Sequence, residues 1–146
     1  MYTPETSRHF ELFVDPVSGV KSWVLKTKVA LQQQSFYFVN RAMDEGGRYL
    51  WFYCSNPPAM YRTLGVVDLE DDEVRVFPET EFIGGPLVDT DTGEAIYGAH
   101  QGIYKKSPKG GDVVRLCPVP EELKKYGKPA SIATQSASLE CQEKAA

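Results

Sequence analysis

The stretch that decides the fold is residues 44–55, which read DEGGRYLWFYCS, a turn followed directly by an apolar run. Acidic residues beside paired glycines are typical of a turn, because Asp bonds to nearby backbone and Gly accepts a positive φ. The run that follows is apolar at successive positions, as in a strand that is buried on both faces. The same arrangement returns at residues 90–100, TDTGEAIYGAH. The sequence therefore predicts a repeated unit that begins with a turn and a buried strand.

Other short strands are expected on both sides of these two stretches. The first two are joined by the loop DPVSG at 15–19 and form a predicted β-hairpin. Pro78 is expected to end its strand, because proline has no N–H to donate to a ladder. The full set of predicted strands is 9–14, 20–26, 35–40, 48–55, 61–69, 73–77, 94–100, 102–107 and 112–117.

The repeat has the length of a propeller blade. Gly47 and Gly93 are 46 residues apart, and Val74 and Val113 are 39 residues apart. Repeats of roughly 40 to 50 residues with four strands each are typical of β-propellers. We therefore predict an all-β fold, a partial propeller of about two four-stranded antiparallel blades plus an N-terminal hairpin. An antiparallel sandwich is the alternative.

The expected organisation is a partial propeller over residues 9–128, followed by a tail. It comprises a hairpin at 9–26, one blade at 35–77, a second at 86–117 and a short helix at 120–126. Residues 129–146 are polar and rich in small side chains, so a disordered or weakly helical tail is expected there.

Composition limits the class of protein. The 146 residues carry a formal charge of −4, which argues against a nucleic-acid partner, since such proteins present basic patches. No run approaches the roughly 18 apolar residues of a membrane span, so no membrane partner is expected. The start, MYTPETSRHFELF, lacks a secretory pattern, and the three cysteines are far apart. We therefore expect a cytoplasmic protein without a disulfide framework.

Catalytic motifs are not evident. His9 and His100 are the only histidines and lie 91 positions apart, so the sequence predicts no metal site; a lone strand-end histidine is usually hydrogen-bonded instead. There is no G-x-S-x-G motif. Cys54 and Cys117 end strands, which favours buried packing over reactive thiols. No catalytic residue, metal ligand or bound cofactor is therefore predicted.

Three clusters of residues have both a structural and a functional interpretation, and one arginine is a candidate ligand-binding residue. The acidic stretch at 68–73 is expected to be a solvated turn rather than a calcium loop. The paired glycines are expected in turns, since no phosphate-loop pattern follows them. Arg41 is a candidate for binding an acidic ligand. Aromatic side chains are either a sugar-stacking platform or, for most of them, core; they are Phe36, Tyr37, Phe38, Tyr49, Trp51, Phe52 and Tyr53.

The order of these motifs resembles the N-terminal part of oligogalacturonate lyases. The matching stretches are F-x-x-F-V-D-P-V-S-G-V-K-x-x-x-L, F-Y-F-V-N, D-E-G-G-R-Y-L-W-F, T-L-G-V-V-D-L-E, Gly84-Gly85 and D-T-G-E-A-I-Y-G, between about Phe10 and Leu123. More loosely, D-x-x-G-R-Y-L-x-F also resembles TolB-like and WD40-like blades. The resemblance implies an intracellular propeller enzyme that cleaves pectin fragments by β-elimination.

The resemblance also implies what this chain lacks. The manganese ligands of the family, several histidines and a glutamine, and its catalytic arginine lie in later blades without counterparts here. Gln33 stands where the family tends to have a histidine. The chain thus corresponds to a fragment, expected to be inactive alone, whose hairpin belongs to the ring-closing blade. A seven-bladed ring needs roughly 300 residues at about 40 per blade.

Candidate substrate-binding residues are Gln33, Asn40, Arg41 and His100. An acidic oligosaccharide is the candidate ligand, and self-association through open sheet edges is a second candidate interaction. A non-catalytic propeller-type carbohydrate- or protein-binding module is the alternative function.

Overall fold

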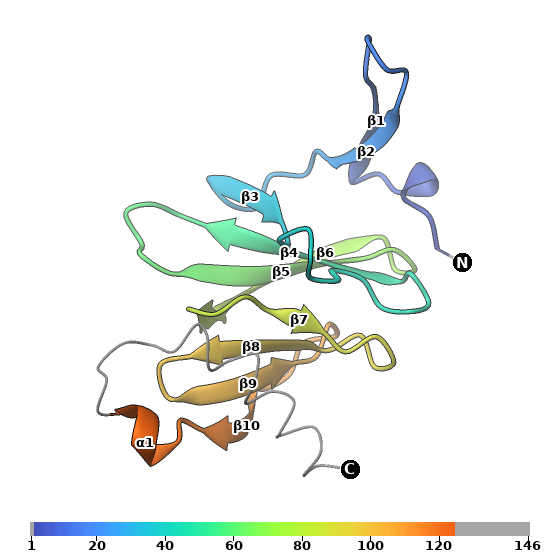
Figure 1. Ribbon diagram of the computed structural model, residues 1–146. Coiled ribbons are helices and arrows are strands. Elements are labelled where there is room, and N and C mark those ends of the chain that lie inside the picture. The colour runs from blue at the N-terminus through green and yellow to red at the C-terminus, as the bar shows by residue number, and fades with distance from the viewer. Residues whose placement is uncertain (1, 125–146) are drawn as a thin grey trace.

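The computed structural model describes residues 2–124 and confirms the predicted all-β class, with antiparallel sheets that form a partial propeller (Figure 1). A 3-10 turn, η1 (Pro4–Thr6), precedes the strands, and α1 (Glu121–Lys124) follows them within the predicted helix at 120–126. The predicted tail at 129–146 lies outside the described residues. The strands are β1 (Phe10–Val14), β2 (Lys21–Leu25), β3 (Gln32–Ser35), β4 (Tyr49–Ser55), β5 (Arg62–Asp68), β6 (Glu73–Phe82), β7 (Leu87–Val88), β8 (Ala95–Ala99), β9 (Gly102–Lys106) and β10 (Val114–Pro118).

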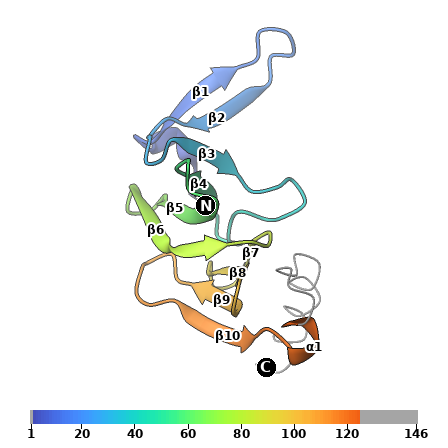
Figure 2. The same ribbon diagram turned by 90° about the vertical axis from the view of Figure 1, so that its left-hand side faces the viewer.

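The described residues form three sheets, which follow one another in chain order. The N-terminal hairpin pairs β1 with β2, the first blade has the order β3-β4-β5-β6, and the second blade runs from β7 to β10. Each blade is a meander in which sequence neighbours pair antiparallel. The hairpin lies at one end of the stack and the second blade at the other in both views (Figures 1 and 2).

Apolar side chains of both blades form the larger core between them. Trp51 of β4 is fully buried there, and its ring centroid lies 5.7 Å from that of Phe77. The Trp51 Nε1–H donates to the backbone oxygen of Gly93 at 2.8 Å, which ties the first blade to the β7–β8 turn. Buried members of this core are Phe36, Tyr49, Trp51, Tyr53, Leu64, Val66, Phe77, Phe82, Val88, Ala95 and Tyr97.

A second core lies on the opposite face of the first blade. Phe10 of the hairpin is buried against Phe52 and Val67, with Trp23 and Leu25 packed beside them. Successive side chains of a strand point to opposite faces of its sheet. Because layers cover both faces of the first blade, β4 is apolar at almost every position, as the sequence indicates.

The repeated turns use matching chemistry. Asp44 accepts a hydrogen bond from Tyr49 N–H at 2.7 Å, and Asp89 accepts one from Asp91 N–H at 3.0 Å. Gly47 and Gly93 both have positive φ, at 70° and 73°. A Cβ on Gly93 would also lie 2.7 Å from the Tyr49 ring, so only glycine fits this turn.

The strand predicted at 35–40 is wrong in position, because β3 ends at Ser35. Gln33 accepts hydrogen bonds from Val29 N–H at 2.7 Å and Ala30 N–H at 3.3 Å, and donates to Thr27 O at 2.9 Å. These bonds connect the preceding turn to β3. The strand therefore forms at the polar residues Gln32–Ser35 and not at the aromatic run that follows. Propensity alone favours the aromatic run, but side-chain bonds to backbone decide the register.

Pro78 does not end β6, which continues to Phe82. The register with β5 shifts between Leu64 and Arg62, which marks a bulge. At this bulge the buried Thr80 hydroxyl accepts from Leu64 N–H at 2.9 Å and donates to Phe77 O at 2.6 Å. A side chain thus replaces ladder bonds, and a bulge is where a sheet tolerates proline.

Candidate functional site

Two aromatic side chains lie exposed in the loop after β3. Tyr37 is 60% exposed and Phe38 is 84% exposed, with ring centroids 4.4 Å apart. A backbone hydrogen bond of 2.8 Å from Asn40 N–H to Tyr37 O closes the turn that carries them. We call Tyr37 and Phe38 the aromatic patch. Exposed rings of this kind offer a stacking surface to a flat apolar ligand face.

The other aromatic residues are core, as expected for most of them. Phe36 stacks on Tyr53 with ring centroids 4.7 Å apart. The loop after β3 therefore buries the first of three consecutive rings and leaves Tyr37 and Phe38 exposed. The buried members of the predicted set are Phe36, Tyr49, Trp51, Phe52 and Tyr53.

Asn40 and Arg41 follow the aromatic patch in the same loop. Asn40 Nδ2–H donates to Pro86 O at 3.1 Å, which connects this loop to the start of the second blade. Arg41 is exposed and forms an ion pair of 3.2 Å with Glu45. An exposed pair of this kind contributes little to stability, about 0–1 kcal/mol. The Arg41 guanidinium can therefore exchange Glu45 for a carboxylate of a ligand.

The structure places the other two candidate residues elsewhere. Gln33 uses its amide inside the turn at 27–33, so it has a structural position. His100 is exposed on the β8–β9 turn, and its ring meets that of Tyr61 edge-on at 5.1 Å. Of the four candidates, Asn40 and Arg41 share one loop with the aromatic patch.

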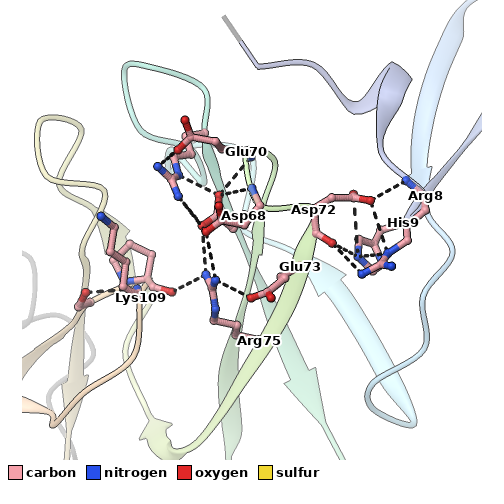
Figure 3. Close-up of polar contacts among 12 residues, drawn as sticks. Arg8, His9, Asp68, Glu70, Asp72, Glu73, Arg75 and Lys109 are labelled. Atoms are coloured by element: carbon pink, nitrogen blue, oxygen red, sulfur yellow. Dashed lines mark hydrogen bonds and ion pairs between the residues drawn. The ribbon is translucent and has the colours of Figure 1, made fainter.

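The β5–β6 turn carries a network of charges that the sequence interpretation missed (Figure 3). Asp68 is fully buried and accepts two bonds from Arg48, Nε–H at 2.8 Å and Nη2–H at 2.9 Å. Arg75 Nη1–H donates to the same carboxylate at 3.1 Å. Asp71 and Glu73 surround these arginines from the exposed side. The predicted solvated turn is thus correct for its tip and wrong for Asp68.

These contacts set the charge of Asp68. Burial by itself raises the pKa of its carboxyl, but hydrogen bonds from Arg48 and Arg75 outweigh burial, so the pKa lies below its ordinary value. The hydrogen bond to Asp68 likewise raises the pKa of Arg48. Asp68 is therefore an ionised acceptor that joins three strands of the first blade, β4, β5 and β6. The sequence signal for this site is the position of Arg48 directly before Tyr49, because Tyr49 lies opposite Asp68 in the β4–β5 ladder.

His9 and Asp72 connect the hairpin to the same turn. His9 Nε2–H donates to Asp72 O at 2.9 Å, and Nδ1 lies 2.8 Å from Thr27 Oγ1. Ser7 Oγ–H donates to the Asp72 carboxylate at 2.6 Å, and this bond lowers the pKa of Asp72. Ser7 therefore bonds to Asp72 and not to the imidazole. The arrangement is a clamp between layers and lacks the nucleophile–base contact of a hydrolase.

The described residues do not fit the manganese that the lyase resemblance implies. Within residues 2–124, no three His, Cys, Asp or Glu side chains are grouped so that they could hold a metal ion. His9 is engaged by the clamp, and His100 contacts Tyr61. Burial raises the pKa of the Cys54 thiol to about 11, so this thiol stays protonated at neutral pH. We therefore derive no metal-dependent step from this part of the chain.

The fold and site define an all-β protein of partial propeller architecture with an exposed aromatic patch and an exposed arginine in the same loop. No helix in the described part of the chain is long and apolar enough to cross a membrane. Comparisons with protein-family models, with curated proteins and with solved structures give no match.

Proposed function

We propose that this chain is the N-terminal portion of a propeller of the oligogalacturonate lyase type and does not catalyse β-elimination by itself. The proposal rests on the order of the motifs between Phe10 and Leu123. The observation that carries it is the stacking of a two-stranded hairpin and two four-stranded antiparallel sheets in chain order. Blades of a propeller bury their faces against one another in this way.

The chemistry of the reaction supports the expectation of inactivity. β-Elimination from a uronate needs a base for the proton α to the carboxylate and a cation that stabilises the developing charge. The described residues offer no metal-ligand group, and their buried charged side chains are engaged in structural pairs. The reacting groups would have to come from further blades.

The DNA that follows the coding region tests this proposal. Translated in all forward frames, it is expected to encode further strand repeats of roughly 40 residues that carry several histidines. A downstream region without such repeats in any frame would contradict the assignment to a lyase-type propeller.

A second candidate function, binding of acidic oligosaccharides without cleavage, is favoured by the aromatic patch. Tyr37 and Phe38 are exposed aromatic residues of the kind on which a sugar ring can stack, and Arg41 follows them in the same loop. A guanidinium recognises a carboxylate in a planar, paired geometry. A uronate oligosaccharide combines both features, a sugar ring and a carboxylate.

Calorimetric titration with oligogalacturonate measures this binding. We expect Arg41→Ala to raise the Kd by about tenfold, and Phe38→Ala by a similar factor, because each removes about 1–2 kcal/mol of interaction. Glu45→Gln is expected to tighten binding, because it releases Arg41 from its ion pair. Lys109→Ala, which removes an exposed charge from the β9–β10 turn, is the matched control and should bind as the wild type does.

The same samples, with and without Mn²⁺, are assayed for the absorbance of unsaturated products. We expect none. Absence of binding heat for the wild type would eliminate the second candidate. Product formed by the purified chain would show that it is catalytic alone.

A further inference from the structure

Among the described residues, no strand pairs with either outer edge of the N-terminal hairpin, and the edge formed by β1 has an unusual surface. In β1, Leu12 is 45% exposed, and Phe13 and Val14 are also exposed. Its ladder with β2 is regular from Phe10 to Val14, without a bulge. Exposed edges are normally protected by lysine, proline or a bulge. β1 has no lysine, proline or bulge and a single charged residue, Glu11, whereas β2 begins at Lys21 and is followed by Lys26.

The hydrogen-bond pattern shows which groups of β1 point away from β2. Lys26 N–H donates to His9 O at 2.9 Å, and Asp15 N–H donates to Val20 O at 2.9 Å. Hydrogen-bonded and non-hydrogen-bonded pairs alternate in an antiparallel ladder. Leu12 therefore occupies a non-hydrogen-bonded position, as does Val14, and their N–H and C=O groups face the free edge.

We propose that this edge pairs with the β1 edge of a second copy of the chain, antiparallel about a twofold axis at Leu12. The resulting sheet has the order β2-β1-β1-β2, with four antiparallel strands as in each blade of the chain itself. Leu12 exchanges two hydrogen bonds with Leu12 of the second copy, and Val14 N–H bonds to Phe10 O. The N–H of Phe10 already bonds to Ser7 O at 3.5 Å, so the new ladder ends there.

The charged residues favour the register with Leu12 on the twofold axis over the register with Phe13 on the axis. With Leu12 on the axis, Glu11 lies opposite Phe13 of the second copy, and Asp15 lies opposite His9 and next to Arg8. With Phe13 on the axis, Glu11 would instead lie opposite Asp15, and like charges directly opposite are destabilising. The edge is therefore more complementary to a second copy with Leu12 on the axis than with Phe13 on the axis.

A second copy fits this edge better than the chain's own remaining residues. These residues follow α1, which lies at the opposite end of the stack from the hairpin (Figures 1 and 2). From residue 131 they read SIATQSASLECQEKAA, which lacks the alternating apolar pattern of a strand. The hairpin is already held in place by Trp23 and Leu25 in the core and by the His9 clamp, so pairing requires little ordering.

Sedimentation velocity of the full chain over a wide concentration range tests the proposal. Because the paired edge is short, we expect a reversible dimer with a Kd on the order of 1–100 μM. Leu12→Lys should raise this Kd at least about tenfold, since a lysine at the edge opposes pairing. Val17→Lys is the matched control: Val17 is 95% exposed in the hairpin turn, off the paired edge, and this variant should dimerise normally.

Oxidative cross-linking keeps the test decisive if Leu12→Lys does not fold. Residues opposite each other in a hydrogen-bonded pair have Cα atoms about 5.5 Å apart, within disulfide range. Leu12→Cys should therefore give a covalent dimer, mapped by mass spectrometry to position 12 of both chains, and Val17→Cys should not. A monomer at every concentration, a dimer that Leu12→Lys leaves unchanged, or cross-linking at position 17 instead of 12 would each overturn the proposal. None of these readouts depends on oligosaccharide binding.

Discussion

Replacing Trp51 by alanine is expected to lower the free energy of unfolding by about 3–5 kcal/mol, the range for large aromatic truncations in a core. The indole is fully buried between the two blades and contacts the Phe77 ring. Its removal leaves a cavity in the core that joins the blades and deletes the bond to Gly93 O. Because small domains are stable by only about 5–15 kcal/mol, this loss is a large fraction of the total. Urea denaturation followed by circular dichroism measures it.

Two variants separate the contributions of packing and hydrogen bonding at this position. Trp51→Phe keeps most of the apolar volume and loses the indole N–H, so we expect a loss of about 1–2 kcal/mol. Phe38→Ala removes an aromatic ring that is exposed and should change stability by less than about 0.5 kcal/mol. If Trp51→Ala were no more destabilising than Phe38→Ala, the face-to-face packing of the blades would be wrong.

Asp68→Asn is expected to destabilise the chain by about 2–4 kcal/mol, because it leaves two arginines facing a neutral group in a buried position. The carboxylate accepts bonds from Arg48 and Arg75. An asparagine keeps the size of the side chain but supplies one acceptor oxygen and no charge. Asp71→Asn is the matched control. Asp71 pairs with the same arginines but is half exposed, so we expect a loss below about 1 kcal/mol.

The pH dependence of stability reports on the same carboxylate. The pKa of Asp68 is depressed in the folded chain, so its contribution is present above the unfolded pKa of about 3.9. It is lost as the pH falls through the folded value. Wild-type stability should therefore fall below about pH 4 by more than that of Asp68→Asn. Parallel acid profiles for the two proteins would contradict an ionised Asp68 in the folded state.

Much of the fold can be predicted from the order of turns and apolar runs. The hairpin and both buried central strands follow from local patterns, since glycine and aspartate mark the turns and short apolar runs mark the strands. The positions of β3 and the end of β6 do not. Gln33 and Thr80 bond to backbone groups and reset the ladder there. Such bonds depend on three-dimensional proximity, so propensity along the chain does not reveal them.

The candidate site was predictable to a smaller extent. Asn40 and Arg41 are candidates from the sequence, and both follow the aromatic patch in the same loop. Gln33 and His100 lie elsewhere, the first used within a turn and the second on another loop. The sequence also shows an acidic turn at 68–73, but only strand pairing reveals that Asp68 is buried between Arg48 and Arg75.

The sequence by itself determined that this protein is built of short antiparallel strands in repeated units, because turn chemistry and apolar runs involve only a few neighbouring residues. Tertiary structure alone decided which of seven aromatic rings remain exposed and which carboxylate is buried. These properties depend on how sheets stack and which strands lie next to each other, and those contacts join residues far apart in the chain.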